Sequence, residues 1–193
     1  MTRLFLLLGC EATGTKLFAS ILKNVFGLSG QISDGSVVRE CDDCFIRFSL
    51  PTGLKNGNYI DSSGWFDLEK GIDNLCRAYG ITKDQITIVF TSRYSWCISE
   101  SLKKQGENRG YELIERSAEY RAFFKKEGYN VVELNYEEVT YNTYAYLRHL
   151  SKILNVTIPL TEEEFRRKCD AINPQNEKHF TESSDYKPAN PLS

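Results

Sequence analysis

The chain lacks several features that would place it in a class at once. No apolar run approaches the length of about 18 residues that a membrane span needs, so the sequence predicts no membrane partner. The net charge is only −2, which predicts no general affinity for nucleic acid or anionic lipid. The apolar residues 4–8 are too few for the core of a signal peptide, so we expect a cytoplasmic protein.

Histidine is scarce, and the cysteines are scattered along the chain. The two histidines are His149 and His179, and both lie late in the sequence. Cys41 and Cys44 have the C-x-x-C spacing of a metal or redox pair, but no second pair exists to complete four zinc ligands. We therefore interpret this pair as structural or incidental and predict no metal site.

Apolar runs alternate with amphipathic segments along the 193 residues. The expected strands are residues 3–9, 45–49, 85–91 and 129–135. The expected helices are residues 15–26, 67–79, 95–104, 107–127 and 141–154, and one more that begins at Thr161. Alternation of this kind implies right-handed crossovers between parallel strands. The sequence thus predicts an α/β fold of three layers, a mostly parallel central sheet with helices on both faces.

Length and composition predict a single domain. Hydrophobic residues make up 41% of the chain, which is typical of a globular protein. We expect the domain to span residues 1–179 and residues 180–193 to form a loosely ordered tail. Residues 28–43 and 51–64 are rich in glycine and polar residues, so we expect two long loops there.

The start of the chain is its most informative stretch. Gly9 and Gly14 bound a loop between the first expected strand and the first expected helix. Backbone N–H groups of such a loop and the helix dipole converge on one point, which predicts a phosphate site. The spacing is close to a Walker A motif, but Thr15 follows the second glycine and Lys16 comes one position late. This shift disfavours an ATPase or kinase; a plain strand–turn–helix is the other alternative.

A second anion site is predicted in the middle of the chain. Arg93 follows the end of an expected strand, where a guanidinium can hold a phosphate through two parallel hydrogen bonds. Ser101 lies eight residues on, about two helical turns further, and can offer a hydroxyl to the same anion. Because the carboxyl ends of parallel strands meet at one edge, we expect Gly9, Ser49, Arg93 and Tyr136 to meet there. A surface arginine and a serine on a helix face are the alternative.

Strand–GxxxxGT–helix followed by strand–Arg–x7–Ser resembles the sulfotransferase family, which uses 3′-phosphoadenosine 5′-phosphosulfate (PAPS). Residues 131–139, which end in Tyr136-Glu137-Glu138-Val139, are similar to a late strand and turn of that family. The resemblance covers residues 3–156 and implies a P-loop, sulfotransferase-like fold. It places Arg93 and Ser101 on the 3′-phosphate. The loop residues that it places on the 5′-phosphosulfate are Ala12, Thr13, Gly14, Thr15 and Lys16.

The resemblance implies transfer of a sulfuryl group from PAPS to a hydroxyl or amine. The family usually carries Lys or Arg where this chain has Ala12. There are three alternatives for the missing positive charge. Either Lys16 supplies it, or another residue supplies it, or the protein binds nucleotide without transferring a sulfuryl group. We take Lys16 as the catalytic electrophile and Glu40 as the general base. The carboxylates that compete with Glu40 are Asp42, Asp43 and Asp61.

The resemblance also implies an acceptor, a small molecule or a glycan. Arg47 and Ser49 are expected to face the same sheet edge and to line its pocket. The other candidates are Lys55, Tyr59, Trp65 and Phe66, because aromatic faces suit sugar or phenolic acceptors. Three alternatives stay open: a P-loop nucleotide kinase, a non-catalytic nucleotide-binding protein that keeps the fold, and an interaction module.

Overall fold

The computed structural model describes residues 3–30, 43–50, 67–104, 106 and 108–172. Its centre is a five-stranded sheet in which every strand pairs in parallel, in the order β2-β3-β1-β4-β5. The strands are β1 (Arg3–Cys10), β2 (Ser29–Gly30), β3 (Asp43–Leu50), β4 (Ile86–Ser92) and β5 (Asn130–Asn135). The predicted α/β class is therefore confirmed, and the sheet is parallel throughout.

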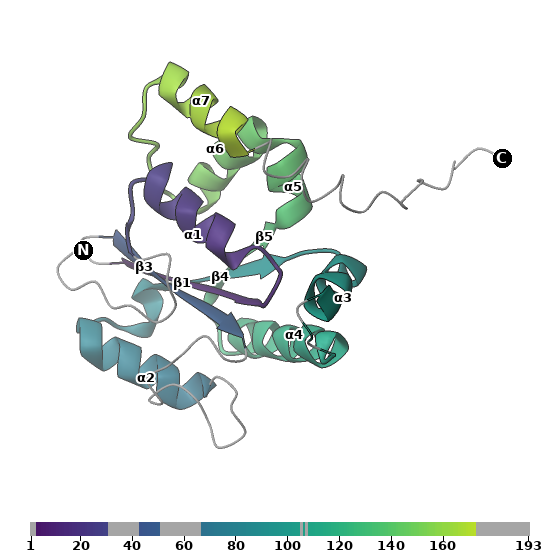
Figure 1. Ribbon diagram of the computed structural model, residues 1–193. Helices are drawn as coiled ribbons and strands as arrows, with labels where there is room; N and C mark the ends of the chain where they lie inside the picture. Colours follow the sequence, from purple (N-terminus) through teal and green to yellow (C-terminus); the bar gives the residue numbers. More distant parts are fainter. Residues whose placement is uncertain (1–2, 31–42, 51–66, 105, 107, 173–193) are drawn as a thin grey trace.

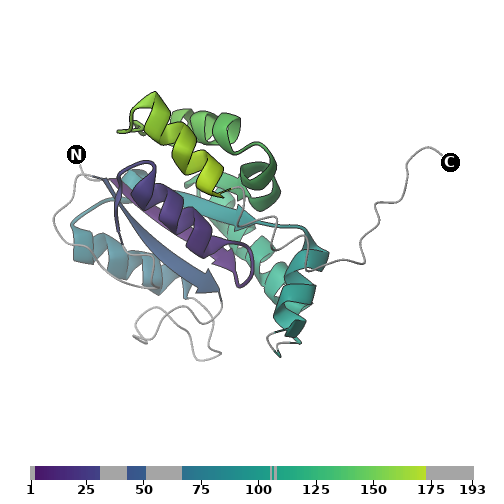
Figure 2. The ribbon, with the colours of Figure 1, turned by 45° about the horizontal axis from the view of Figure 1, so that its top comes forward.

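Helices cover both faces of this sheet (Figures 1 and 2). The helices are α1 (Thr15–Asn24), α2 (Leu68–Tyr79), α3 (Ser95–Lys104), α4 (Gly110–Lys126), α5 (Tyr136–Tyr141), α6 (Thr143–Ile153) and α7 (Glu162–Ile172). Helices α1, α6 and α7 pack on one face, and α2, α3 and α4 pack on the other. None of the described helices is long and apolar enough to cross a membrane.

Strand β1 lies at the centre because it can be buried on both faces. Its side chains alternate between the two apolar cores, with Leu4, Leu6 and Leu8 in one and Phe5 and Leu7 in the other. Such a continuous apolar run is typical of a central parallel strand. Burial of both faces fixes the register, and β1 runs beside β3 from Arg3 to Cys10.

Most of the predicted elements are confirmed to within about two residues, whereas strand β2, helix α5 and the 3₁₀ helix Lys83–Gln85 were not predicted. Strand β2 lies inside the segment 28–43 that we expected to be a loop, and it pairs only through Ser29 and Gly30. Helix α5 follows β5 at once, since the Asn135 side chain accepts a hydrogen bond from Glu138 N at 2.9 Å. Both elements are too short to show a hydrophobic period. The tail 180–193 lies outside the described residues.

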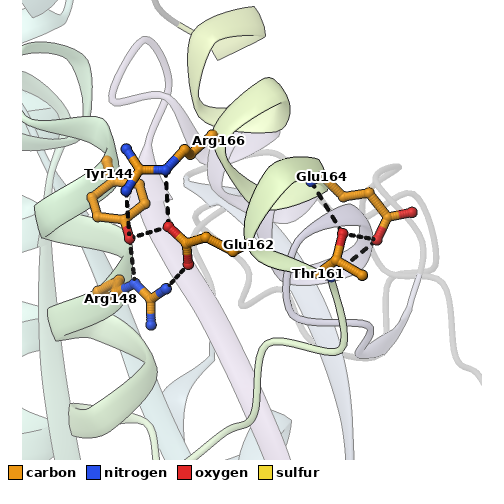
Figure 3. A network of polar contacts seen from close by, with 6 residues as sticks. All are labelled: Tyr144, Arg148, Thr161, Glu162, Glu164 and Arg166. Atoms are coloured by element: carbon orange, nitrogen blue, oxygen red, sulfur yellow. Dashed lines mark hydrogen bonds and ion pairs between the residues drawn. The ribbon is translucent and has the colours of Figure 1, made fainter.

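Helix α7 is attached to α6 by a polar cluster (Figure 3). The Tyr144 hydroxyl donates to Glu162 Oε1 at 2.5 Å and accepts from Arg148 Nε at 3.0 Å. Arg148 and Arg166 both form ion pairs with Glu162, the latter from Nε at 3.0 Å. One carboxylate and one phenol therefore hold two guanidinium groups at the junction of the helices.

This cluster lowers the pKa of the Glu162 carboxyl group below its ordinary value. The hydrogen bond from Tyr144 is the largest cause that lowers this pKa, followed by the charges of Arg148 and Arg166. Tyr144→Phe is therefore expected to raise the pKa of Glu162, measured by an NMR titration of its carboxyl carbon. Tyr111→Phe, an exposed tyrosine on α4, is the matched control and should leave it unchanged.

The direction of this shift also fixes its effect on stability. A carboxylate with a lowered pKa stabilises the folded state above its ordinary value of 4.5, and that contribution is lost as the pH falls through the folded pKa. Tyr144→Phe should therefore narrow the difference in melting temperature between pH 7 and pH 3. An identical Glu162 titration in both proteins would contradict the role given to Tyr144.

Candidate functional site

The turn after β1 is pinned to the neighbouring strand β4. The Thr13 hydroxyl donates to Cys10 O at 2.7 Å and is hydrogen-bonded to the Thr91 hydroxyl, also at 2.7 Å. Both threonines are buried. A Cβ at Gly9 would lie 1.9 Å from Thr91 Oγ1 and 2.6 Å from Thr13 Oγ1. Glycine is therefore required at this position so that the two hydroxyls can meet over the strand.

The second glycine is required for its backbone conformation. Gly14 caps α1 with a φ of 85°, and a Cβ there would lie 2.4 Å from Tyr136 Cδ2. Ala12 also has a positive φ, 67°, which costs an L-residue roughly 1–2 kcal/mol. The first N–H groups of a helix have no partner within it, so the start of α1 offers donors beside this turn.

A cavity of about 370 Å³ opens beside the turn; we call it the loop cavity. Its lining residues are Glu11, Ala12, Gly14, Thr15, Lys16, Arg47 and Ser49. The lining includes two cationic side chains and one carboxylate, and the N-terminus of α1 adds partial positive charge. The balance of charge in the loop cavity favours an anionic ligand.

Arg47 is the most deeply buried charged group of this cavity. Its side chain is only 3% exposed, and Nη1 donates to Thr15 Oγ1 at 3.0 Å and to Ser49 Oγ at 2.7 Å. The two hydroxyls are also 3.0 Å apart. The guanidinium of Arg47 on β3 is thereby hydrogen-bonded to Thr15, the first residue of α1. Sequence reasoning placed Arg47 and Ser49 in an acceptor pocket, and the structure places them in the loop cavity with Thr15 and Lys16.

Arg93 reaches the glycine turn from the other side. Its Nη1 donates to Ala12 O at 3.2 Å, a contact between residues 81 positions apart. The guanidinium carbon lies 4.5 Å from the centroid of the Tyr136 ring, a cation–π contact. Gly14 also packs against this ring, so Tyr136 contacts both the turn and Arg93. The two predicted anion sites are thus neighbours at the carboxyl edge of the sheet.

A second cavity, about 180 Å³, lies on the far side of the turn. We call it the α3–α4 cavity. Its polar lining residues are Cys10, Thr13, Thr91, Ser92, Arg93, Ser95, Ser117 and Arg121, and its apolar ones are Phe90, Ile98, Ile114 and Ala118. Ser101 is half-buried on α3 and lines neither cavity. Ser117 on α4 does line the α3–α4 cavity, although no motif or spacing in the sequence marks it as a site residue.

The candidates for the general base fall into two groups. Glu40, Asp42 and Asp61 lie outside the described residues, as do Lys55 and the aromatic candidates of the acceptor pocket. Asp43 is described, and its position excludes it. It pairs with Arg3 at 2.9 Å at the amino end of β3, whereas Gly9 lies beside Ser49 at the carboxyl end.

Comparison with protein-family models gives no match, and comparison with curated proteins gives no significant one. In the part of the chain that the structure describes, no group of three or more His, Cys, Asp or Glu side chains is placed to hold a metal ion. Cys44 is buried in β3, and Cys41 lies outside the described residues. The features that bear on function are therefore the two cavities and the turn between them.

Proposed function

We propose that this protein is a sulfotransferase-like enzyme that transfers a sulfuryl group from PAPS to a hydroxyl or amine of a small molecule or glycan. The observation that carries the proposal is the contact between Arg93 and Ala12. It puts a cation on one side of the glycine turn, while Lys16 and Arg47 lie on the other. A nucleotide with separate 3′ and 5′ anionic groups needs two such sites one nucleoside apart, whereas ATP carries its phosphates in a single chain.

The residues of the loop cavity fit the chemistry of the transfer. The acceptor loses a proton, its oxygen or nitrogen bonds to sulfur, and the bond from sulfur to the 5′-phosphate oxygen breaks. Charge builds on the departing phosphate, where N–H groups at the start of α1 and the Lys16 ammonium stabilise it. Ala12 leaves the turn without a cation of its own, and the Arg47 guanidinium takes that place from β3. The proposed base, Glu40, rests on the family resemblance alone.

The proposal is tested by thermal stabilisation with adenosine 3′,5′-bisphosphate, ATP and AMP, each with and without magnesium. We expect the bisphosphate to stabilise the protein most, without magnesium. Stronger stabilisation by magnesium–ATP would instead favour a P-loop nucleotide kinase. Binding of the bisphosphate with no transfer from labelled PAPS to a mixed acceptor panel would favour a non-catalytic nucleotide-binding protein. Stabilisation by no nucleotide would point to an interaction module.

Arg93→Ala gives the sharpest variant for this test. Hydrogen bonds to charged groups contribute about 1.5–3 kcal/mol, so the variant should lose at least about tenfold of its preference for the bisphosphate over AMP. Isothermal titration calorimetry with both nucleotides measures that ratio. Arg116→Ala, an exposed arginine of α4, serves as the control. A preference that survives in Arg93→Ala would count against the proposal.

A further inference from the structure

Two buried polar atoms without a hydrogen-bond partner line the same small cavity. They are Arg93 Nε and Ser117 Oγ, and both line the α3–α4 cavity. A buried polar atom left unsatisfied costs about 1–3 kcal/mol, so native proteins rarely keep one without a reason. Two such atoms, on residues from different elements that line one cavity, point to a ligand that completes their hydrogen bonds.

Several other polar groups of this cavity are already engaged. Thr13 and Thr91 are hydrogen-bonded to each other, and Arg121 forms an ion pair with Glu133 at 3.0 Å. The Cys10 thiol lies close to Ser117, but sulfur is a weak acceptor and leaves most of the capacity of the hydroxyl unused. Burial raises the pKa of Cys10 to about 11, so its thiol stays neutral at physiological pH.

The charge around this cavity favours an anion. Its described lining residues include two arginines and no Asp or Glu. Ser95 is the first residue of α3, so the N-terminal end of that helix also borders the cavity. About 180 Å³ equals roughly six water molecules, which is enough for a tetrahedral oxyanion. A doubly charged phosphate ester fits this lining better than a neutral group.

We infer that Ser117 is a specificity-determining residue of the nucleotide site. Its hydroxyl donates to an oxygen of the 3′-phosphate, and Arg93 Nε donates to another, so α4 takes part in recognition of the anion. This inference rests on the proposed function. It differs from the family resemblance, which gives the hydroxyl to Ser101 on α3, a residue that lines neither cavity.

The test compares Ser117→Ala with the wild-type protein in binding adenosine 3′,5′-bisphosphate and AMP. We expect the affinity for the bisphosphate to fall about tenfold, because a hydrogen bond to a charged group is lost, and the affinity for AMP to stay the same. The ligand-free variant should melt close to wild type, because the hydroxyl loses only a weak interaction with the Cys10 thiol. Ser117→Thr keeps the hydroxyl and should restore the affinity. Ser151→Ala, on α6, is the matched control serine.

Three results would overturn the inference: an unchanged bisphosphate affinity in Ser117→Ala, an equal loss for AMP, or a loss confined to Ser101→Ala. Failure of the proposed function is distinguishable from these. In that case the wild-type protein itself would bind the bisphosphate no better than AMP, whatever residue stands at position 117.

Discussion

Arg47→Gln is expected to lower sulfuryl transfer by about 100-fold or more while the protein stays folded. Removal of a single donor that stabilises developing charge typically costs a factor of 10²–10³ in kcat. Arg47 is buried in the loop cavity, where a hydrogen bond to an anion is stronger than in water. Glutamine keeps a polar amide in the cavity, but it is shorter than arginine and does not replace Nη1 beside the Thr15 and Ser49 hydroxyls, and the positive charge is removed.

The measurement is single-turnover transfer from labelled PAPS, with titration of adenosine 3′,5′-bisphosphate as a second readout. Affinity for the bisphosphate should change much less than transfer, because that product lacks the sulfuryl group. Arg47→Lys restores the charge without the planar fork and should recover part of the rate. Arg77→Gln, on an exposed part of α2, is the matched control. Wild-type transfer in Arg47→Gln would contradict a role for this side chain.

Gly9→Ala is expected to cause the largest loss of stability of any single methyl addition in the turn. The added carbon would lie 1.9 Å from Thr91 Oγ1 and 2.6 Å from Thr13 Oγ1, and both hydroxyls are fixed by hydrogen bonds. Overpacking of a buried site costs typically about 1–3 kcal/mol, and a clash this close on a central strand should reach at least about 3 kcal/mol. Urea unfolding followed by circular dichroism measures the free energy of unfolding.

Gly80→Ala provides the matched control. Gly80, unlike Gly9, has a positive φ, 61°, but nothing lies within 4 Å of its added carbon, so the variant should lose only about 1–2 kcal/mol, from the backbone conformation alone. Gly9→Ala combined with Thr91→Ala should lose less than the sum of the two single losses, because the shortest contact is then gone. Strict additivity would show that the clash with Thr91 is not the cause.

The sequence was sufficient for the elements that have a clear period. The continuous apolar run from Leu4 to Leu8 predicts a strand that is buried on both faces, and β1 is the central strand. The β-branched run at 85–91 predicts β4, which spans Ile86–Ser92. Helix α7 begins after Thr161, as the sequence predicts, and in the structure Thr161 and Glu164 cap its first turn. Local propensity and capping act over a few residues, so a sequence can be read for them.

Only some residues of the candidate site could be predicted from the sequence. Arg47 had a visible signal, a charge inside an apolar strand, but its contact with Thr15 depends on β3 lying beside β1. Ser117 had none, because a serine on a charged helix is ordinary until α4 packs against the carboxyl ends of β1 and β4. Ser101 had a spacing signal, yet helix α3 leaves it outside both cavities.

The sequence by itself determined the α/β class, the glycine turn before the first helix and an arginine at the end of a strand. Each of these depends on hydrophobic period, backbone conformation or chain order within a short segment. Only the tertiary structure decided which side chains surround the turn: Arg47 from β3, Arg93 after β4 and Ser117 from α4. The reason is that the order of strands in a sheet and the packing of helices over it bring together residues far apart in the chain, and no local pattern records that order.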